Sequence, residues 1–389
     1  MMLFSIDGAE TKSTFDHTLI VCIVLLTGAG IAALYSASYA FAELWFKGDR
    51  WYFVIRQLKF AALGFVIFFI TANIDIEKIR AIIIFLVIAA VILCVLTFVP
   101  GIGRNINGAS RWIGAGGFSF QPSELVKLIL PLYLAHIFDK KQGKQNSFVS
   151  GVLPPALVTA LFFVLILLQN NFSTAIFIAV NALIIFFLAG IGIGFFLGAA
   201  VIILPVTSLL VLSEEHRLRR LISFMWPDWE PLGAGYQVNA SVLTISSGGF
   251  WGKGLGQGTR KVVSVPEIQS DFIFSAYSEE GGFIGVVLFI LVFAVFAWRG
   301  YRAALNADSA FKRLLALGMV TTIFTQMLLN IAVVSGAVPA TGIPLPFFSA
   351  GGSSLLISLI MSALIVNISR APVSSLKKEN MNNGIYHGI

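Results

Sequence analysis

Ten long apolar runs constrain the possible folds of this chain more than any other feature of its sequence. A helix that crosses a lipid bilayer needs about 17–25 mostly apolar residues. Runs of about this length lie at 19–39, 52–72, 79–99, 121–138, 151–168, 172–189, 193–212, 279–298, 314–334 and 351–368. Charged residues make up only 12% of the 389 residues, whereas soluble domains carry about 25%. The sequence therefore predicts an all-α polytopic membrane protein with about ten transmembrane helices.

The positions of lysine and arginine predict how these helices are oriented. Cytoplasmic segments of membrane proteins carry an excess of both residues over the short outer loops. If the N-terminus is inside, the inner segments hold thirteen of them. The short outer loops then hold four, which are Lys47, Arg50, Arg104 and Arg111. We therefore expect both termini in the cytoplasm, with one large extracytoplasmic loop, 213–271, between the seventh and eighth helices.

No polar linker or internal repeat divides the chain, so residues 1–370 are expected to form a single transmembrane domain. The polar residues 371–389 are expected to be a cytoplasmic tail. Three acidic residues and one lysine precede the first apolar run, which argues against a cleaved signal peptide. Cys22 and Cys94 fall within apolar runs and are expected to be buried free thiols. The four histidines are scattered, so no zinc or haem site is predicted.

The first polar region that needs an explanation is the stretch GIGRNINGASRWIGAGG with the QPSELVKL that follows soon after it. Its glycines predict an irregular outer loop that carries Arg104 and Arg111. The proline of the second stretch is expected to open a helix, on which Glu124 and Lys127 share a face because they are three residues apart. Two interpretations stay open: the pair stabilises the helix, or it belongs to a cationic wall that binds phosphate or pyrophosphate.

The second polar region is the long loop 213–271, and long loops without a domain of their own are usually functional. Its first part, SEEHRLRRLISFMW, has a basic and an apolar face and is expected to form an interfacial helix. That helix could be a plain membrane anchor or part of a substrate site. The glycine-rich stretch SSGGFWGKGLGQGTRK then supplies Lys253, Arg260 and Lys261, but its glycines match no nucleotide-binding fingerprint.

The third feature is a group of carboxylates at the start of the eighth apolar run. Asp271 stands directly before Phe-Ile-Phe, and Glu279 and Glu280 follow. Asp271 could cap the next helix. A cap, however, does not require two further carboxylates that continue toward the membrane, where charge is costly. A carboxylate at a membrane edge, opposite basic loops, also suits a general base, so both interpretations stay open.

Six stretches together carry a family resemblance. They are NGASRWIG (107–114), QPSELVKL (121–128), GAGYQ (233–237), GGFWGKGLGQG (248–258), VPE…DFIFSAYSEEGGFIG (265–285) and TGIPLPFFSAGGSS (341–354). In this order, over nearly the whole chain, they resemble the SEDS proteins (shape, elongation, division and sporulation), whose members include FtsW, RodA and SpoVE. The stretches LYSASYA, GKGLGQGTRK and TGIPLPF look most similar to the FtsW branch.

The resemblance implies a ten-pass peptidoglycan glycosyltransferase that polymerises lipid II at the outer face of the cytoplasmic (inner) membrane, at the division septum. The implied partners are a class B penicillin-binding protein, other division proteins and membrane lipids, and no nucleic acid. The essential aspartate of the family maps onto Asp271, which would be the catalytic base. The residues expected to bind or orient the pyrophosphate are Arg104, Arg111, Glu124, Lys127, Lys253, Arg260 and Lys261. A divalent cation, Mg²⁺ or Mn²⁺, would be compatible with such a site, although the sequence contains no dedicated cage of metal ligands.

The chain also departs from the family pattern. Gln269 and Ser270 stand where the family has His-Thr, and FMWPDWEP (224–231) exchanges the order of a family motif. Asn171 replaces an aspartate that is expected to pair with the lysine of QPSELVKL. An asparagine cannot neutralise that lysine, so we expect Lys127 to pair with Glu124 or with substrate phosphate.

Two other functions are compatible with the sequence. A lipid II flippase or other transporter should show repeat symmetry and polar groups near the bilayer midplane, and the sequence shows no such repeat. A non-catalytic scaffold for a penicillin-binding protein is expected to have lost the aspartate or the basic loops, and this chain keeps both. The sequence therefore favours the polymerase.

Overall fold

The computed structural model describes residues 15–46, 48–106, 108–115, 118–143, 147–226, 233, 235–258 and 268–370. The described elements, in chain order, are α1 (His17–Trp45), α2 (Tyr52–Asn73), α3 (Ile76–Ala81), α4 (Ile83–Leu96), β1 (Gly103–Ile106), β2 (Ala109–Ala115), β3 (Phe118–Phe120), α5 (Pro122–Lys140), the π-helical turn η1 (Phe148–Val152), α6 (Leu153–Leu168), α7 (Phe172–Leu188), α8 (Ile193–Leu212), α9 (Glu215–Met225), α10 (Tyr236–Ser247), α12 (Ile273–Leu305), α13 (Ala310–Val334) and α14 (Gly352–Ile368).

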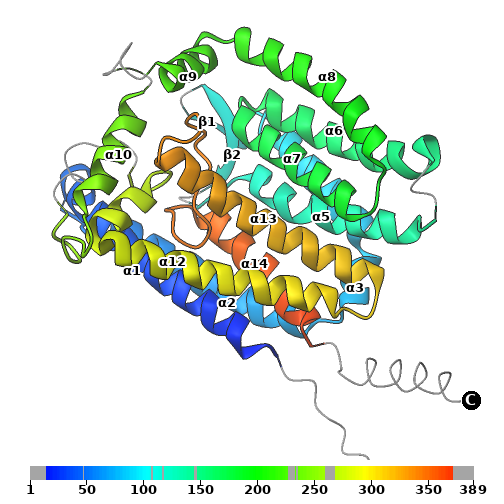
Figure 1. The fold of residues 1–389 in the computed structure, drawn as a ribbon, viewed down its shortest axis with the longest axis horizontal. Coiled ribbons are helices and arrows are strands. Elements are labelled where there is room, and N and C mark those ends of the chain that lie inside the picture. Colours follow the sequence, from blue (N-terminus) through cyan, green and yellow to red (C-terminus); the bar gives the residue numbers. More distant parts are fainter. Residues whose placement is uncertain are drawn as a thin grey trace, which may run out of the picture.

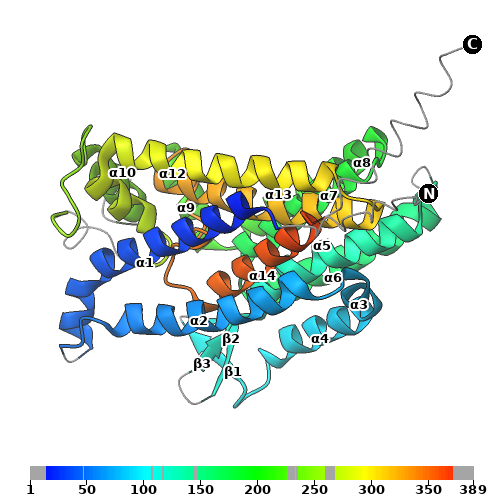
Figure 2. The ribbon, with the colours of Figure 1, turned by 90° about the horizontal axis from the view of Figure 1, so that it is seen from below.

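The helices form a bundle around α5, α13 and α14 (Figures 1 and 2). α2 packs against α14, α1 packs against α12, and α13 packs against both α12 and α5. Most residues of α5 and α14 are buried, as is typical of helices at the centre of a large bundle. None of the residues of α8, all of which the structure describes, is buried. The bundle therefore has a packed centre, and α8 lies at its surface.

Each of the ten apolar runs overlaps a helix, as predicted. Within the described residues, six helical segments are long and apolar enough to cross a membrane: α1, α2, η1 with α6, α8, α12 and α13. α4, α7 and α14 are apolar but shorter. Cys22 and Cys94 are free and buried, as expected. The helical character of the runs is confirmed, six of the helical segments are candidate membrane spans, and the total of ten crossings stays a prediction.

The stretch expected to be an irregular outer loop is instead a three-stranded antiparallel sheet with the order β1-β2-β3, so that expectation is wrong. Its glycines permit the sheet rather than disrupt it. Gly108, in the turn between β1 and β2, has a φ of 76°, a conformation that glycine adopts without strain. A Cβ on Gly103 would lie 1.9 Å from the main-chain oxygen of Thr97, so β1 can approach the end of α4 only because that residue is glycine.

α12 is not one continuous helix. Gly282 has φ 59° and ψ −163°, which is not helical, and it separates a short first segment that starts at Ile273 from the long apolar segment that follows. The apolar run was expected to begin at residue 279, so the structure adds a turn-and-a-half of helix before it. The short segment begins two residues after Asp271.

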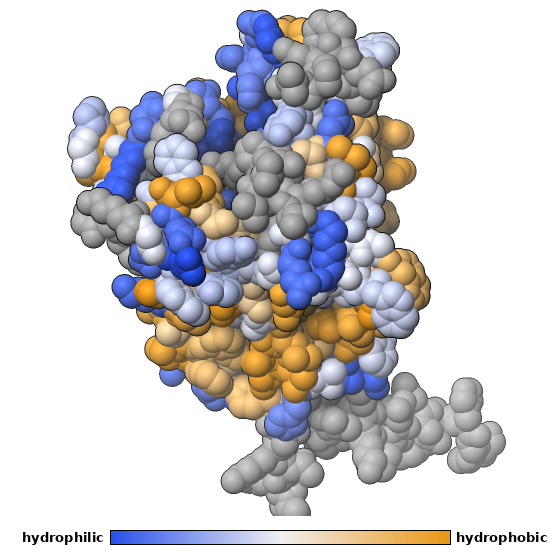
Figure 3. Space-filling view, turned by 90° about the vertical axis from the view of Figure 1, so that its left-hand side faces the viewer, coloured by the Kyte–Doolittle hydropathy of each residue, from blue (hydrophilic) through white to orange (hydrophobic). Residues whose placement is uncertain are grey.

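The start of α1 and the end of α14 lie at the same end of the bundle. The main-chain N–H of Asp16 donates to Ser369 Oγ at 3.4 Å, and Asp16 Oδ2 accepts from Arg299 Nε, near the end of α12, at 2.7 Å. The sheet, α9 and α10 lie toward the opposite end, on the left of Figure 1. Figure 3 faces that end and shows hydrophilic residues gathered over its upper and middle parts.

Candidate functional site

Asp271 lies where the chain returns to the bundle after the long loop. α12 begins at Ile273 with Phe272 as its N-cap, so Asp271 does not occupy the capping position that one interpretation of the sequence required. The residue is half-buried. Its main-chain oxygen accepts a hydrogen bond from Asn330 Nδ2 of α13 at 2.8 Å, which fixes the backbone at this point without using the carboxylate.

The loop between α13 and α14 forms the floor under the carboxylate. Asn330 Nδ2 also donates to the main-chain oxygen of Ile343 at 2.9 Å, and the N–H of Ala350 donates to the main-chain oxygen of Gln269 at 2.9 Å. Gly342, in the TGIPLPF stretch, has a φ of 70°, and a Cβ there would lie 3.1 Å from Asp271 Oδ2. This glycine therefore makes the turn and also leaves room for the carboxylate.

Arg111 of β2 and Arg220 of α9 both interact with the charge of Asp271. Burial is the largest effect on each guanidinium and lowers its pKa from the ordinary value. The positive charge of Arg220 lowers the pKa of Arg111 further, whereas the carboxylate of Asp271 acts in the opposite direction on both arginines. Arginine stays protonated even so. One anionic and two cationic groups, from three separate elements, are thus close enough to influence one another.

The turn between α6 and α7 positions Arg111. One terminal amino group of Arg111 donates to the main-chain oxygen of Asn170, and Asn170 Nδ2 donates to the main-chain oxygen of Gly108 at 2.9 Å. Arg111 Nε is buried and has no hydrogen-bond partner among the described residues. Buried donors are normally paired, so this N–H is a donor that an anionic ligand could satisfy.

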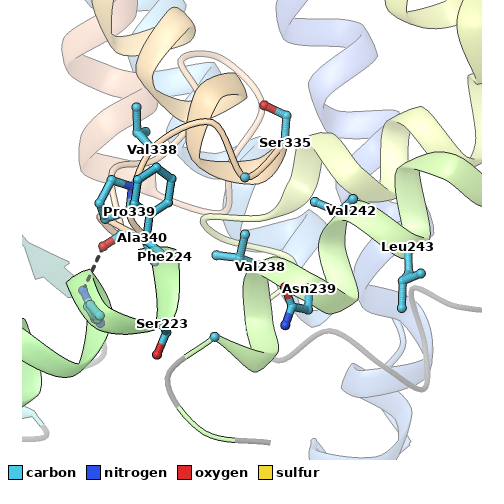
Figure 4. A pocket seen from close by; sticks show the side chains of 13 residues that line it. Ser223, Phe224, Val238, Asn239, Val242, Leu243, Ser335, Val338, Pro339 and Ala340 are labelled. Atoms are coloured by element: carbon cyan, nitrogen blue, oxygen red, sulfur yellow. Dashed lines mark hydrogen bonds between the residues drawn. The ribbon is translucent and has the colours of Figure 1, made fainter. Parts of the chain in front are cut away.

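A cavity of about 390 Å³ opens beside Arg220 (Figure 4). α9 forms one side with Ser223 and Phe224, α10 forms another, and the start of the loop after α13 closes the top (Figure 4). Arg220 Nη1 donates to the main-chain oxygen of Ala340 at 3.4 Å, which is the dashed line in Figure 4. The lining mixes apolar side chains with hydroxyl groups and the Asn239 amide, as is usual for ligand pockets. The predicted interfacial helix therefore contributes Arg220 both to the charged group and to the wall of the cavity.

Glu124 and Lys127 lie beneath the floor, where Lys127 borders a small cavity of about 10 Å³. Their exposed fractions are only 3% and 2%. Lys127 Nζ lies 2.7 Å from Glu124 Oε1 and donates to Gln326 Oε1 at 3.1 Å. Gln326 Nε2 in turn donates to the main-chain oxygen of Pro344 at 2.8 Å. Of the two partners expected for Lys127, the structure provides Glu124, and the pair supports the α13–α14 loop from below.

The residues that replace the family pattern also have defined places. Asn171 is the N-cap of α7, and its Nδ2 donates to Ser123 Oγ at 3.2 Å. It thus binds a neighbour of the Glu124–Lys127 pair without adding charge. Gln269 is buried and contributes its main-chain oxygen to the floor described above.

Two other predicted site residues that the structure describes, Arg104 and Lys253, have different surroundings. Arg104 is exposed on β1, where it pairs with Trp112 of β2 in the strand register. Lys253 forms an ion pair with Glu279 at 2.6 Å. Arg260 and Lys261 lie outside the described residues. Among the residues that the structure describes, the carboxylate acts on one predicted cation, Arg111, and on one that the sequence analysis did not single out.

That additional residue is Arg220, which was considered only as part of a basic interfacial helix. A signal for it exists in the helical spacing. Glu215 and Arg219 are four residues apart and pair on the exposed side of α9, at 2.7 Å. Arg220 cannot share that pairing and projects from a different face. A basic helix in which one arginine has an acidic partner and another has none nearby in sequence points to a partner elsewhere in the fold.

The donor set around Asp271 fits an anion better than a cation. Guanidinium N–H groups and amides donate hydrogen bonds, and they suit phosphate oxygens. In the parts of the chain that the structure describes, no three His, Cys, Asp or Glu side chains are placed to hold a metal ion. A single carboxylate fits Mg²⁺ or Mn²⁺ poorly.

Comparison with known proteins identifies the family of this arrangement. The FtsW/RodA/SpoVE family model, described as cell cycle protein, matches residues 16–373. The chain belongs to this family. A probable peptidoglycan glycosyltransferase FtsW from Trichlorobacter lovleyi is 40% identical over 355 residues, which are 91% of this chain and 93% of that protein. Stage V sporulation protein E of Bacillus subtilis is 38% identical over 359 residues, which are 92% of this chain and 98% of that protein.

Solved structures of the FtsW/RodA/SpoVE family share the fold. One, from a study of how a peptidoglycan synthase complex coordinates polymerization and crosslinking, matches with a TM-score of 0.76 and 26% identity, over 92% of this chain and 98% of that one. The crystal structure of the rod shape determining protein RodA of Thermus thermophilus matches with a TM-score of 0.67 and 26% identity, over 92% of this chain and 97% of that one. The chain is therefore an integral membrane protein with the helical fold of this family.

Proposed function

We propose that this protein is a peptidoglycan glycosyltransferase that polymerises lipid II at the outer face of the cytoplasmic membrane. The observation that carries the proposal is the group formed by Asp271, Arg111 and Arg220 next to a cavity. A base beside two cations is what a glycosyl transfer with a pyrophosphate leaving group requires. The names of the FtsW relatives, probable peptidoglycan glycosyltransferases, support the same activity.

In the proposed mechanism, Asp271 acts as the general base. The 4-hydroxyl of the acceptor sugar attacks the anomeric carbon of the donor and gives its proton to the carboxylate. The new C–O bond forms as the bond between that carbon and the pyrophosphate breaks, so a single displacement inverts the configuration. Undecaprenyl pyrophosphate leaves with the bonding electrons. General base catalysis of this kind contributes about 100- to 10,000-fold to a rate.

The two arginines stabilise the negative charge that grows on the leaving pyrophosphate. Preorganised donors are most effective where charge develops in a site that excludes water. The buried, unpaired Nε of Arg111 is such a donor, and Arg220 brings its charge from the cavity side. The pair of Lys127 and Glu124 holds the floor in this scheme and does not touch the substrate. Arg104, Arg260 and Lys261 stay candidates for contacts with more distant parts of the pyrophosphate.

The polyprenyl chain of the substrate needs an apolar surface that is open to the lipid. A groove of about 490 Å³ between α8 and the α6–α7 pair offers one, because its lining is almost entirely apolar. Arg217 of α9 lies 5.0 Å from the ring centroid of Phe172, which lines this groove. α9 thus links the groove to the charged group, and we place the lipid tail there.

We also propose the setting in which the enzyme works. Ten crossings with both termini inside would place the sheet, α9 and Asp271 at the outer face, where lipid-linked sugars are polymerised. A class B penicillin-binding protein is the proposed partner, supported by the similarity to a peptidoglycan synthase complex. The similarity to proteins named FtsW supports a role at the division septum of the inner membrane, together with other division proteins.

The test is polymerisation of lipid II by purified protein, alone and with a class B partner. Replacing Asp271 with Asn keeps its size and removes the base, so we expect glycan synthesis to fall about 100-fold or more while lipid II binding persists. Glu43→Gln is the matched control, because Glu43 is an exposed carboxylate that pairs with Arg50, and we expect wild-type activity from it.

Polymer of equal amount from the wild type and Asp271→Asn would overturn the assignment of the base. No polymer from the wild type, even with the partner present, would overturn the polymerase itself. In that case transport of lipid II into vesicles would distinguish a flippase from a non-catalytic scaffold.

A further inference from the structure

Two glutamates, Glu279 and Glu280, are buried at the end of the short first segment of α12. Their exposed fractions are 0% and 4%. Both precede Gly282, where the helix is interrupted. A buried carboxylate that lacks partners is strongly destabilising, so the contacts of this pair indicate what the fold uses it for.

Glu279 is tied to the glycine-rich loop that follows α10. Its Oε1 lies 2.6 Å from Lys253 Nζ and accepts from Ser247 Oγ at 3.2 Å. Lys253 Nζ also donates to Ser247 Oγ at 3.2 Å. The main chains meet at the same place, because the N–H of Lys253 donates to the carbonyl oxygen of Glu279 at 3.0 Å. The ammonium group of Lys253 thus has its ionic partner within the protein.

Glu280 is tied to the same loop and to α1. Its Oε1 accepts from the N–H of Gly256 at 2.9 Å and from Ser36 Oγ of α1. The carbonyl oxygen of Glu280 accepts from the N–H of Gly254 at 3.1 Å. Ser36 Oγ also accepts from the N–H of Gly256 at 3.2 Å. One carboxylate therefore connects α12, the glycine-rich loop and α1.

The glycines of the loop allow this close approach. A Cβ on Gly252 would lie 2.1 Å from the carbonyl oxygen of Glu280, and a Cβ on Gly282 would lie 2.1 Å from the main-chain nitrogen of Gly252. Past the interruption, the N–H of Phe283 donates to the carbonyl oxygen of Gly249 at 2.9 Å. The loop thus takes the backbone hydrogen bonds that the helix itself leaves unmade at the break.

These contacts hold together the two ends of the segment of chain that carries Asp271. The chain leaves the contacts at Gly256 and returns to them at Glu279, and Asp271 lies between the two. Joining the two ends of a long segment removes conformational freedom that the segment would otherwise keep. Asp271 and Glu279 are separated along the chain by little more than the two turns of helix that begin at Ile273. A displacement of these contacts would therefore be transmitted to the Asp271 carboxylate through the first helical segment of α12.

We propose that Lys253, Glu279, Glu280 and Ser36 form a carboxylate anchor that positions Asp271 for the transfer reaction. The anchor acts through the backbone and does not contact the substrate. Lys253 is accordingly a positioning residue and not a ligand of the pyrophosphate, which differs from the role that the sequence predicted for it. The inference rests on the proposed role of Asp271 as the base.

The test separates positioning from binding by steady-state kinetics of lipid II polymerisation. Glu279→Lys and Lys253→Glu each place like charges together, and the double variant exchanges the pair. Misplacing a catalytic group by about 1 Å can reduce a rate about 100-fold, so we expect each single variant to lower kcat by about 10- to 100-fold with little change in KM. The exchanged pair should recover most of kcat.

Two milder variants keep the proposal testable if the charge reversals do not fold. Ser36→Ala removes one hydroxyl and no charge, so it disturbs Glu280 less than a charge reversal does, and we expect kcat to fall several-fold with KM unchanged. Lys253→Arg keeps the charge and should retain most of kcat, whereas Lys253→Met should not. The matched control is the same exchange in the exposed pair of Lys312 and Asp308, which lie 2.9 Å apart, and it should leave both constants unchanged.

A rise in KM for lipid II with kcat preserved in Lys253→Met would overturn the proposal and assign Lys253 to substrate binding. Unchanged kinetics in Lys253→Met and Ser36→Ala would also overturn it. The result for Asp271→Asn is independent of these variants. If Asp271→Asn is fully active, the base assignment fails first, whereas an inactive Asp271→Asn beside a fully active Lys253→Met removes only the anchor.

Discussion

At the scale of single residues, the candidate site depends on one carboxylate and two arginines that come from distant parts of the chain. The motif around Asp271 could be recognised in the sequence, because the carboxylate follows a fixed pattern of neighbours. Arg111 could be named for the same reason. For Arg220, the helical spacing indicates a partner elsewhere in the fold but does not say which one, because that follows from where α9 lies relative to β2 and the 268–272 segment.

The pKa of Arg220 leads to a prediction about pH. Burial lowers this pKa from its ordinary value, and Asp271 opposes the shift. Arginine begins so high that it stays charged, but a lysine begins at about 10.4 and would be lowered in the same direction. A cation with a lowered pKa loses its charge as the pH rises through that pKa. We therefore expect Arg220→Lys to be active near neutral pH and to lose activity at an alkaline pH at which the wild type still works.

The measurement is kcat/KM for lipid II polymerisation across the range from about pH 7 to 10. Arg219→Lys is the control, because Arg219 is exposed and pairs with Glu215 on the other side of the same helix. Identical alkaline profiles for Arg220→Lys and Arg219→Lys would contradict the role of Arg220 in stabilising charge.

At the scale of elements, hydropathy predicted the helices well and their interruptions poorly. The ten apolar runs became helices because a buried backbone must satisfy its own hydrogen bonds in lipid. The sheet β1–β3 was missed because its glycines were read as signs of irregularity, although Gly103 and Gly108 serve close packing and a turn. The interruption of α12 at Gly282 was missed because a hydropathy window averages over it and does not detect a partner loop.

The adjacent Gly281 and Gly282 of α12 allow the contact between the helix interruption and the glycine-rich loop to be tested. Gly282 has a combination of φ and ψ that essentially only glycine adopts, so an alanine there would cost about 1–3 kcal/mol from the backbone alone. Its Cβ would also meet Gly252, as described above. A Cβ on Gly281 would meet nothing within 4 Å, and alanine in a helical position is favoured over glycine by about 1 kcal/mol.

We therefore expect Gly282→Ala to lower the melting temperature of the detergent-solubilised protein and Gly281→Ala to leave it unchanged or raise it. The two variants add the same methyl group one residue apart, so a difference in melting temperature reports the position and not the size of the change. Equal melting temperatures would show that the α12 segments do not meet the glycine-rich loop in the way described.

At the scale of the whole molecule, the orientation in the membrane decides which reactants the site can reach. The ends of α1, α12 and α14 that meet around Asp16 belong to segments rich in lysine and arginine, which favours the cytoplasm for that end. The turn between α12 and α13 lies there too. α1 is 29 residues long and spans about 44 Å at 1.5 Å per residue, enough to cross the bilayer. Its far end, with α9 and the sheet, is then outside.

Single cysteines report this orientation directly, because the natural Cys22 and Cys94 are buried and should react slowly. Asp49, just beyond the end of α1, and Asp308, in the α12–α13 turn, are both exposed. In intact spheroplasts we expect a membrane-impermeant maleimide to label Asp49→Cys and not Asp308→Cys, and to label both after permeabilisation. The opposite pattern would place Asp271 on the cytoplasmic side. A glycosyltransferase with its base on that side could not extend a wall outside the cell, so the proposed function would fall together with the proposed orientation.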